Sequence, residues 1–178
     1  MATATETDTI LAWHFAPDTG RSRYTDEPIF PGAVFAVSGT PAVCGPFPHG
    51  CVRPMDALEC GFGCYVSRVR LSGEMAHDRG KVAAQRREHL WCADAKRTLC
   101  EFALWCAGQP TDRQLPNVVE LIAARFAEGV LWLAADAAAR AAFGASRELA
   151  TWTAAVAEAR DAQNAELERR LLLLAPAG

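Results

Sequence analysis

The sequence contains no apolar run that approaches the roughly 20 residues needed for a membrane-spanning helix. Its first residues are polar and acidic, so it also lacks the basic and apolar segments of a secretory signal. From these two absences we expect a soluble protein of the bacterial cytoplasm that makes no contact with a membrane.

An excess of basic residues is missing as well. The chain has 18 Lys and Arg against 21 Asp and Glu, a net charge of -3, which argues against a dedicated nucleic-acid-binding protein. With 178 residues, of which 51% are hydrophobic and 22% charged, the composition is typical of one globular domain rather than of a disordered chain.

Closely spaced cysteine pairs are absent too. The chain has seven cysteines, and a stretch rich in proline and glycine contains four of them together with His49. These four, Cys44, Cys51, Cys60 and Cys64, are separated by six, eight and three residues, unlike the Cys-x2-Cys pairs of structural zinc sites. We therefore expect no metal, and we expect free thiols in a reducing compartment.

The first 75 residues show the pattern of strands and loops. Ile10–Ala16 and Ala33–Val37 are short apolar segments followed by turn residues, which predicts two strands. Pro54–Glu59 predicts a short helix, because proline is favoured at the first helical position. Cys64–Leu71 predicts the clearest strand, which Gly73 would end.

From Lys81 onward the apolar spacing is helical. Asn117 would begin one helix, and a last helix would run from Ser146 to about Leu174 with an apolar stripe along it. The residues near intervals of three and four in the first part of this half are Val82, Leu90, Leu99, Phe102, Ala103 and Cys106.

These patterns predict an α+β fold in a single domain over residues 1–178. Its strand and loop half spans residues 1–75, and its helical half spans residues 81–175. Alanine has the highest helix propensity, and its small side chain lets helices approach closely. We therefore expect a small twisted N-terminal sheet packed under a C-terminal helical layer rich in alanine.

Two histidines are the candidate catalytic residues. His14 lies on the first predicted strand and His49 on the loop rich in proline and glycine. Imidazole titrates near neutral pH and can donate and accept hydrogen bonds, so two of them in one cleft would suit acid–base or substrate-orienting chemistry. A histidine on a strand is also commonly a structural residue, and the sequence leaves open whether the two side chains meet.

A basic segment between residues 79 and 97 is the candidate partner-binding surface. It has six basic residues against two acidic ones, Glu88 and Asp94, and would form a face of the predicted helix. Such a face could bind phosphate or an acidic protein surface, or could simply be solvated. Its basic members are Arg79, Lys81, Arg86, Arg87, Lys96 and Arg97.

Several short motifs are spread over nearly the whole chain. They are Leu11–Phe15, Cys44 with His49, Arg53–Leu58, Cys64–Gly73, Lys81 with Ala83, Asp94-Ala95 leading to Phe102-Ala103, and Gln163–Arg170. Together they resemble an uncharacterised family of short proteins, a domain of unknown function, from high-GC bacteria and their phages. The resemblance implies an accessory protein of phages or mobile elements and no assigned activity.

That family is in turn distantly similar to ADP-ribosyltransferases. The similarity implies a histidine on the first strand, here His14, and then a loop, here with His49, that leads to a short helix. It also implies NAD as the cosubstrate. A catalytic glutamate on a late strand has no counterpart, because we expect the chain to be helical after Gly80.

The sequence therefore favours an accessory protein that binds a host protein or nucleoprotein complex and needs no cofactor. Inhibition of a bacterial defence complex, in the manner of an anti-CRISPR protein, is one candidate action. The alternative is an NAD-dependent enzyme of the ADP-ribosyltransferase type, with His14 and His49 as its catalytic residues. The sequence leaves the oligomeric state open.

Overall fold

The computed structural model confirms the α+β class that the sequence predicts. The chain divides into two compact units, Met1–Asp94 with Ala175–Gly178, and Ala95–Leu174. The residues that the structure describes are 9–23, 25–43, 45–61, 63–108, 130, 134–135, 137–138 and 149–177.

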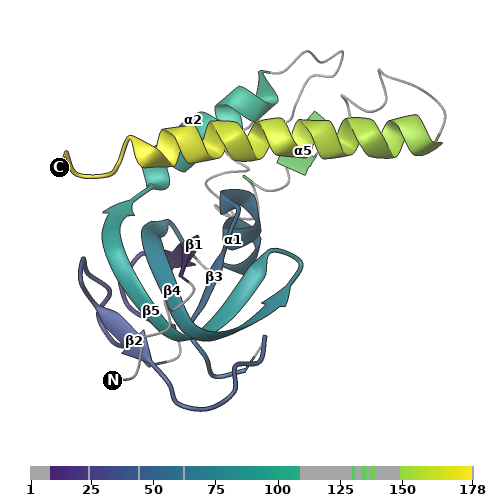
Figure 1. Cartoon of the computed structure of the whole chain (residues 1–178). Helices are drawn as coiled ribbons and strands as arrows, with labels where there is room; N and C mark the ends of the chain where they lie inside the picture. The colour runs from purple at the N-terminus through teal and green to yellow at the C-terminus, as the bar shows by residue number, and fades with distance from the viewer. Residues whose placement is uncertain are drawn as a thin grey trace. The chain divides into compact units, whose positions relative to one another are not determined.

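The first unit contains a five-stranded antiparallel sheet and one short helix (Figure 1). Its elements are β1 (Ile10–Ala16), β2 (Val34–Ala36), β3 (His49–Cys51), helix α1 (Pro54–Cys60), β4 (Tyr65–Asp78) and β5 (Lys81–Asp94). β1 pairs with β3 and β4, and β5 pairs with the same two strands, so these four strands form a closed ring. β2 is added to the ring at β5.

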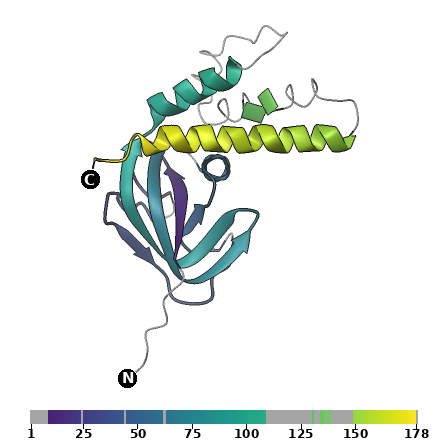
Figure 2. The same ribbon diagram turned by 45° about the horizontal axis from the view of Figure 1, so that its top comes forward.

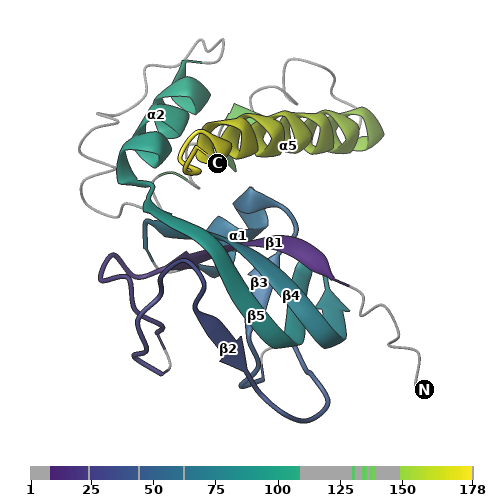
Figure 3. The same cartoon turned by 60° about the vertical axis from the view of Figure 1, so that its left-hand side comes forward.

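The long hairpin of β4 and β5 curves around the ring, and Figure 3 shows its two strands side by side. Its turn consists of Arg79 and Gly80, with φ of 44° and 87°, which fits a two-residue hairpin turn of type I′. The pairing register shifts twice, and Gly73, with φ of 84°, lies at the second shift. Such irregularities bend a strand. β4 therefore continues past Gly73, where we had expected it to end.

The sequence-based prediction of a helix from Lys81 is wrong, because Lys81–Asp94 forms strand β5. The apolar spacing fits a helix, but backbone pairing with β4 holds the whole of Lys81–Asp94 in a strand. Long-range pairing overrides local spacing when a segment can complete a sheet. The helical half of the chain consequently begins at Lys96.

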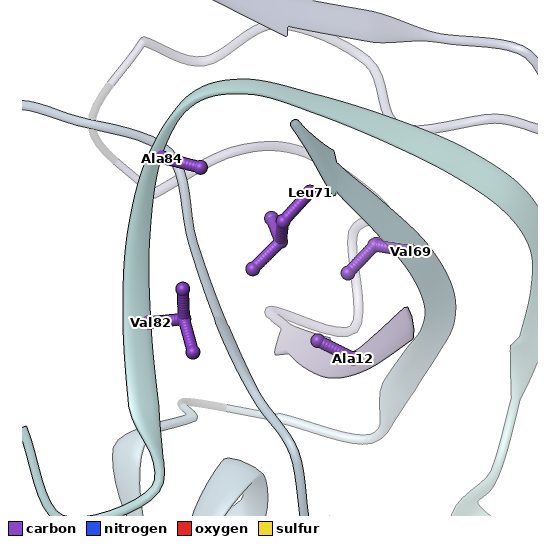
Figure 4. Packing of buried hydrophobic residues seen from close by; sticks show 5 residues of the cluster. All are labelled: Ala12, Val69, Leu71, Val82 and Ala84. Atoms are coloured by element: carbon purple, nitrogen blue, oxygen red, sulfur yellow. The ribbon is translucent and has the colours of Figure 1, made fainter. Parts of the chain in front are cut away.

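The inner face of the ring holds an apolar cluster (Figure 4). Its members come from β1, β4 and β5 and are at most 1% exposed: Ala12, Val69, Leu71, Val82 and Ala84. β3 passes close to this cluster at Gly50, where a Cβ atom would lie 2.9 Å from the Cβ of Ala12. Glycine is therefore required at this position for the strand to close the ring.

Helix α1 has the position that the sequence predicted. Pro54 occupies its first turn, and Met55 and Leu58 are buried as the helix packs against β1. The chain leaves the helix at Gly61, where a Cβ atom would lie 2.5 Å from the Cβ of Phe15. A side chain at residue 61 would therefore push the helix away from β1.

The second unit contains helices α2 (Lys96–Ala107) and α5 (Leu149–Leu172), which contact each other (Figure 2). Leu167 and Leu171 are fully buried, as the apolar stripe on the last helix predicted. The expected helix that begins at Asn117 lies outside the described residues.

None of the helices that the structure describes combines the length and apolarity needed to cross a membrane.

Candidate functional site

The first unit contains a cavity of about 1040 Å³ that is lined by both candidate histidines. His14 reaches it from β1 and His49 from β3, so the structure brings the two together. Strand β5 and the segment before β3 add basic and aromatic lining, and residues 22–27 add further polar groups. We call it the histidine cavity and define it by His14, Phe35, Phe47, His49, Lys81 and Arg87.

The register of β1 and β4 explains why His14 is on this side of the sheet. Ala12 pairs with Val69 in the apolar cluster, and His14 pairs with Ser67 two residues further along. Successive side chains of a strand point to opposite faces, so residues two apart share a face. His14 and the fully buried Ser67 therefore continue the inner face that Ala12 and Val69 begin.

Strand β5 adds a third histidine that the sequence analysis missed. His89 is fully buried, and its ring packs edge-on against His14 and Phe35, with centroids 5.5 and 5.4 Å apart. Its backbone pairs with Val69, which places it on the same inner face. Alternation with Arg87, two residues earlier, would have predicted its position in a strand, whereas the register shift after His89 places Trp91 on the other face.

Arg87 is the buried cation of the histidine cavity. It is only 6% exposed, its Nη1 donates a hydrogen bond of 2.8 Å to the backbone oxygen of His49, and its guanidinium lies 5.2 Å from the Phe35 ring centroid. Its Nε has no hydrogen-bond partner, and no carboxylate of the described residues forms an ion pair with it. Burial lowers the pKa of Arg87 to about 10, so it remains charged at neutral pH.

His14, His49 and His89 are all neutral at neutral pH. Burial, followed by the charge of Arg87, lowers the pKa of His14 well below its usual value and that of His89 to about 3. Burial and then the charge of Lys81 lower the pKa of His49 to about 4. Each ring also has one buried nitrogen without a partner: Nδ1 of His14, Nε2 of His49 and Nε2 of His89.

Acidic side chains are scarce around this cavity. Among the described residues that line it, Glu27 is the single carboxylate, and it accepts a hydrogen bond of 2.9 Å from Thr25. Glu88 does lie on a late strand, which the sequence analysis had ruled out, but it pairs with Arg70 at 3.2 Å and does not line the cavity. Arg87 lines it instead.

The basic segment does not form one helix face. Arg79 lies in the hairpin turn, Lys81 and Arg87 line the histidine cavity, and neighbouring Arg86 is exposed. Adjacent strand residues point to opposite faces, which separates Arg86 from Arg87. The remaining two members are exposed on α2 in the second unit: Lys96 and Arg97. The partner-binding role of these six residues stays a prediction.

Cys92, the cysteine next to His89, is not an activated nucleophile. The Sγ of Cys92 lies 4.0 Å from the Nδ1 of His89. Burial raises the pKa of Cys92 by more than the neighbouring Ser67 and Tyr65 lower it, so the group is a protonated thiol at neutral pH.

The expected absence of a metal stays a prediction. Within the part of the chain that the structure describes, no three His, Cys, Asp or Glu side chains are grouped to hold a metal ion. The six described cysteines are free, and Cys44 lies outside the described residues.

Comparisons of the chain with protein-family models, with curated proteins and with solved structures found no match.

Proposed function

We propose that the protein binds a small anionic ligand in the histidine cavity, with the anion next to Arg87. The observation that carries this proposal is the burial of Arg87 without a carboxylate partner among the described residues. Removing an ion from water costs several kcal/mol, and an opposite charge offsets part of that cost. A bound anion would supply the missing charge.

The polar groups around Arg87 suit such a ligand. Nη1 is engaged by the His49 backbone, which leaves the unpartnered Nε edge of the guanidinium for the anion. A guanidinium edge binds carboxylate and phosphate through two parallel hydrogen bonds. The neutral rings of His14 and His49 can each donate or accept a further bond.

The size of the cavity favours an organic anion over a simple inorganic one. Its volume of about 1040 Å³ is just above the range of about 300–1,000 Å³ that is typical of small-molecule sites. Phe35 and Phe47 line it together with the polar groups, so apolar parts of a ligand would find matching walls. Phosphate esters with an organic group fit this description.

NAD-dependent ADP-ribosyl transfer is the second candidate, favoured by the presence of His14 and His49 in one cavity. NAD carries a pyrophosphate, so it belongs to the ligand class proposed above. Glu27 is the described carboxylate available to stabilise a sugar cation in this cavity. The cosubstrate and the two catalytic histidines are parts of this second proposal.

The role of a phage-type accessory protein that binds a host macromolecule stays a prediction. Arg79 and Arg86 on the first unit, and Lys96 and Arg97 on the second, are the exposed cations that such a partner would meet. Affinity capture from a host lysate, with each pair changed to Glu in turn, tests this role. We expect at least one pair to abolish capture; unchanged capture by both variants would exclude these residues.

The ligand proposal is tested by calorimetry and thermal unfolding with pyrophosphate, AMP and NAD. We expect saturable binding of at least one probe, because a ligand that binds the native state stabilises it, by about 2.7 kcal/mol at 100 times its dissociation constant. Arg87→Met should abolish the effect. Arg86→Met is the matched control, since it removes the neighbouring exposed charge from the same strand.

Two results would contradict the ligand proposal. One is the absence of binding by all three probes at millimolar concentration. The other is an equal loss of binding in the Arg86 and Arg87 variants, which would indicate general attraction by positive charge.

A further inference from the structure

Two cysteines from different elements meet in the wall of the histidine cavity. Cys51 is the last residue of β3, and Cys60 is the last residue of α1. Both line the cavity, and the Cys60 thiol is close enough to act on the Cys51 thiol. Cys51 is 2% exposed, whereas Cys60 is exposed to solvent. We propose that Cys51 and Cys60 form a reversible disulfide.

The packing of α1 holds the two thiols in this position. Pro54, Met55 and Leu58 are buried, and the helix contacts both β1 and β3. The helix therefore returns Cys60 to the strand that ends at Cys51. A disulfide needs Cβ atoms about 3.5–4.5 Å apart, so the link requires the contacting ends of α1 and β3 to hold the two residues at this spacing.

The different surroundings of the thiols assign them different roles. Burial, followed by the neighbouring Cys60, raises the pKa of the Cys51 thiol well above its usual value. Cys60 is the accessible sulfur and is therefore the one that meets an external oxidant. The buried Cys51 is then the resolving thiol.

A low-molecular-weight disulfide, RSSR, is a sufficient oxidant. The Cys60 thiolate attacks one sulfur of RSSR, which forms a mixed disulfide and releases RS⁻. Cys51 loses its proton and attacks the Sγ of Cys60, which releases the second RS⁻. Both thiolates take up the protons that the two cysteines lost. The balance is two protein thiols and RSSR converted to one protein disulfide and two RSH.

The disulfide would join the end of α1 to the end of β3 in the cavity wall. The disulfide proposal does not depend on the anion proposal, because neither cysteine belongs to the group formed by Arg87, His14 and His49. Cys92 provides an internal comparison, since its neighbours are His89, Ser67 and Tyr65 rather than a cysteine.

The test is a redox titration of the full chain with reduced and oxidised glutathione, followed by alkylation and mapping without reduction. Glu-C cuts after Glu6, Glu59 and Glu74 but not at the Glu27–Pro28 bond, so the peptides 7–59 and 60–74 stay joined only by a disulfide. Fragmentation of the joined pair distinguishes Cys51 and Cys60 from Cys44 and Cys64. We expect the Cys51–Cys60 link to form and to disappear again in excess reduced glutathione.

Two variants sharpen this test. Cys60→Ser changes an exposed residue and should abolish the link. Cys51→Ala removes the other cysteine of the pair and should also abolish it. Cys92→Ser, the control, should retain it. The proposal is overturned if glutathione remains attached to Cys60 with Cys51 unmodified, if the link joins other cysteines, or if it survives in the Cys60→Ser variant.

Discussion

The inner face of the first unit has an apolar end and a polar end, and the contrast separates stability from function. At the apolar end, Ala12, Val69 and Leu71 are fully buried against one another. At the polar end, β1 supplies His14, which pairs with Ser67, and β5 supplies Arg87, which borders the apolar end because it pairs with Leu71. The apolar side chains of the first end need no hydrogen-bond partners and are held by packing contacts alone. The other leaves nitrogen atoms of His14 and Arg87 without a partner.

If the proposed ligand binds in the histidine cavity, folding and ligand binding use different residues of one sheet face. Buried polar groups without partners reduce stability, so a natural chain that retains several of them in one place commonly uses them for function. We therefore expect substitutions at the apolar end to lower stability, and substitutions at the polar end to lower ligand binding.

The largest expected effect is at the apolar end. Leu71→Ala removes a fully buried side chain from the cluster and should lower the free energy of unfolding by about 2–5 kcal/mol, because the lost contacts leave a cavity. Denaturant unfolding measures this. Leu11→Ala, at a half-exposed position of β1, is the matched control and should change stability far less. Similar losses at both positions would contradict the assignment of the core.

The next effect is a dependence of stability on pH that arises at the polar end. The folded protein holds His49 and His89 neutral down to pKa values of about 4 and 3, whereas the unfolded chain protonates histidine near pH 6.5. The unfolded state therefore binds more protons between these values, and the free energy of unfolding should fall as the pH is lowered from about 6.5 towards 4.

The slope of this pH dependence identifies the groups. Each such histidine contributes at most about 1.4 kcal/mol per pH unit in this window. His89→Gln should reduce the slope, and His77→Gln, which removes an exposed imidazole on β4, is the control. Denaturant unfolding at a series of pH values measures it. A slope that is unchanged by His89→Gln would show that this imidazole is not buried in the neutral form.

Arg87→Met should have the greatest effect on ligand binding but a smaller effect on stability. Arg87→Met removes a buried charge and also its hydrogen bond to the His49 backbone, so the two consequences oppose each other. We expect the free energy of unfolding of the ligand-free protein to change by about 1 kcal/mol or less. A loss of several kcal/mol would show that Arg87 is a structural residue, and would break the contrast between the two ends.

The smallest effect is expected on the outside of the same strands. Arg70→Ala removes an ion pair of 3.2 Å with Glu88, both of them partly exposed. Exposed ion pairs contribute about 0–1 kcal/mol, so the free energy of unfolding should change little, and less at high salt. Comparing ligand binding and unfolding free energy of this variant with those of Arg87→Met then distinguishes an exposed cation from a cation of the cavity.

The sequence predicted most of the local elements of the first 75 residues, but it placed His49 in a loop where the structure has the short strand β3. The apolar run at Ile10–Ala16 and the proline at residue 54 are local signals, and the strand and the helix occur where these signals place them. His14 and His49 were also identified from residue type alone. Leu167 and Leu171 fall on the buried stripe of the last helix for the same reason, a regular spacing along the chain.

The sequence by itself determined the α+β class, the short elements and the two candidate histidines, because each depends on neighbours within a few residues. Only the tertiary structure decided that Lys81–Asp94 is a strand, since its partner is the preceding strand β4 and its apolar spacing fits a helix equally well. With that strand came His89 and the burial of Arg87, which the basic composition of the segment had placed on a surface. Burial of a charge depends on which strands close around it, and that closure is a long-range property of the ring.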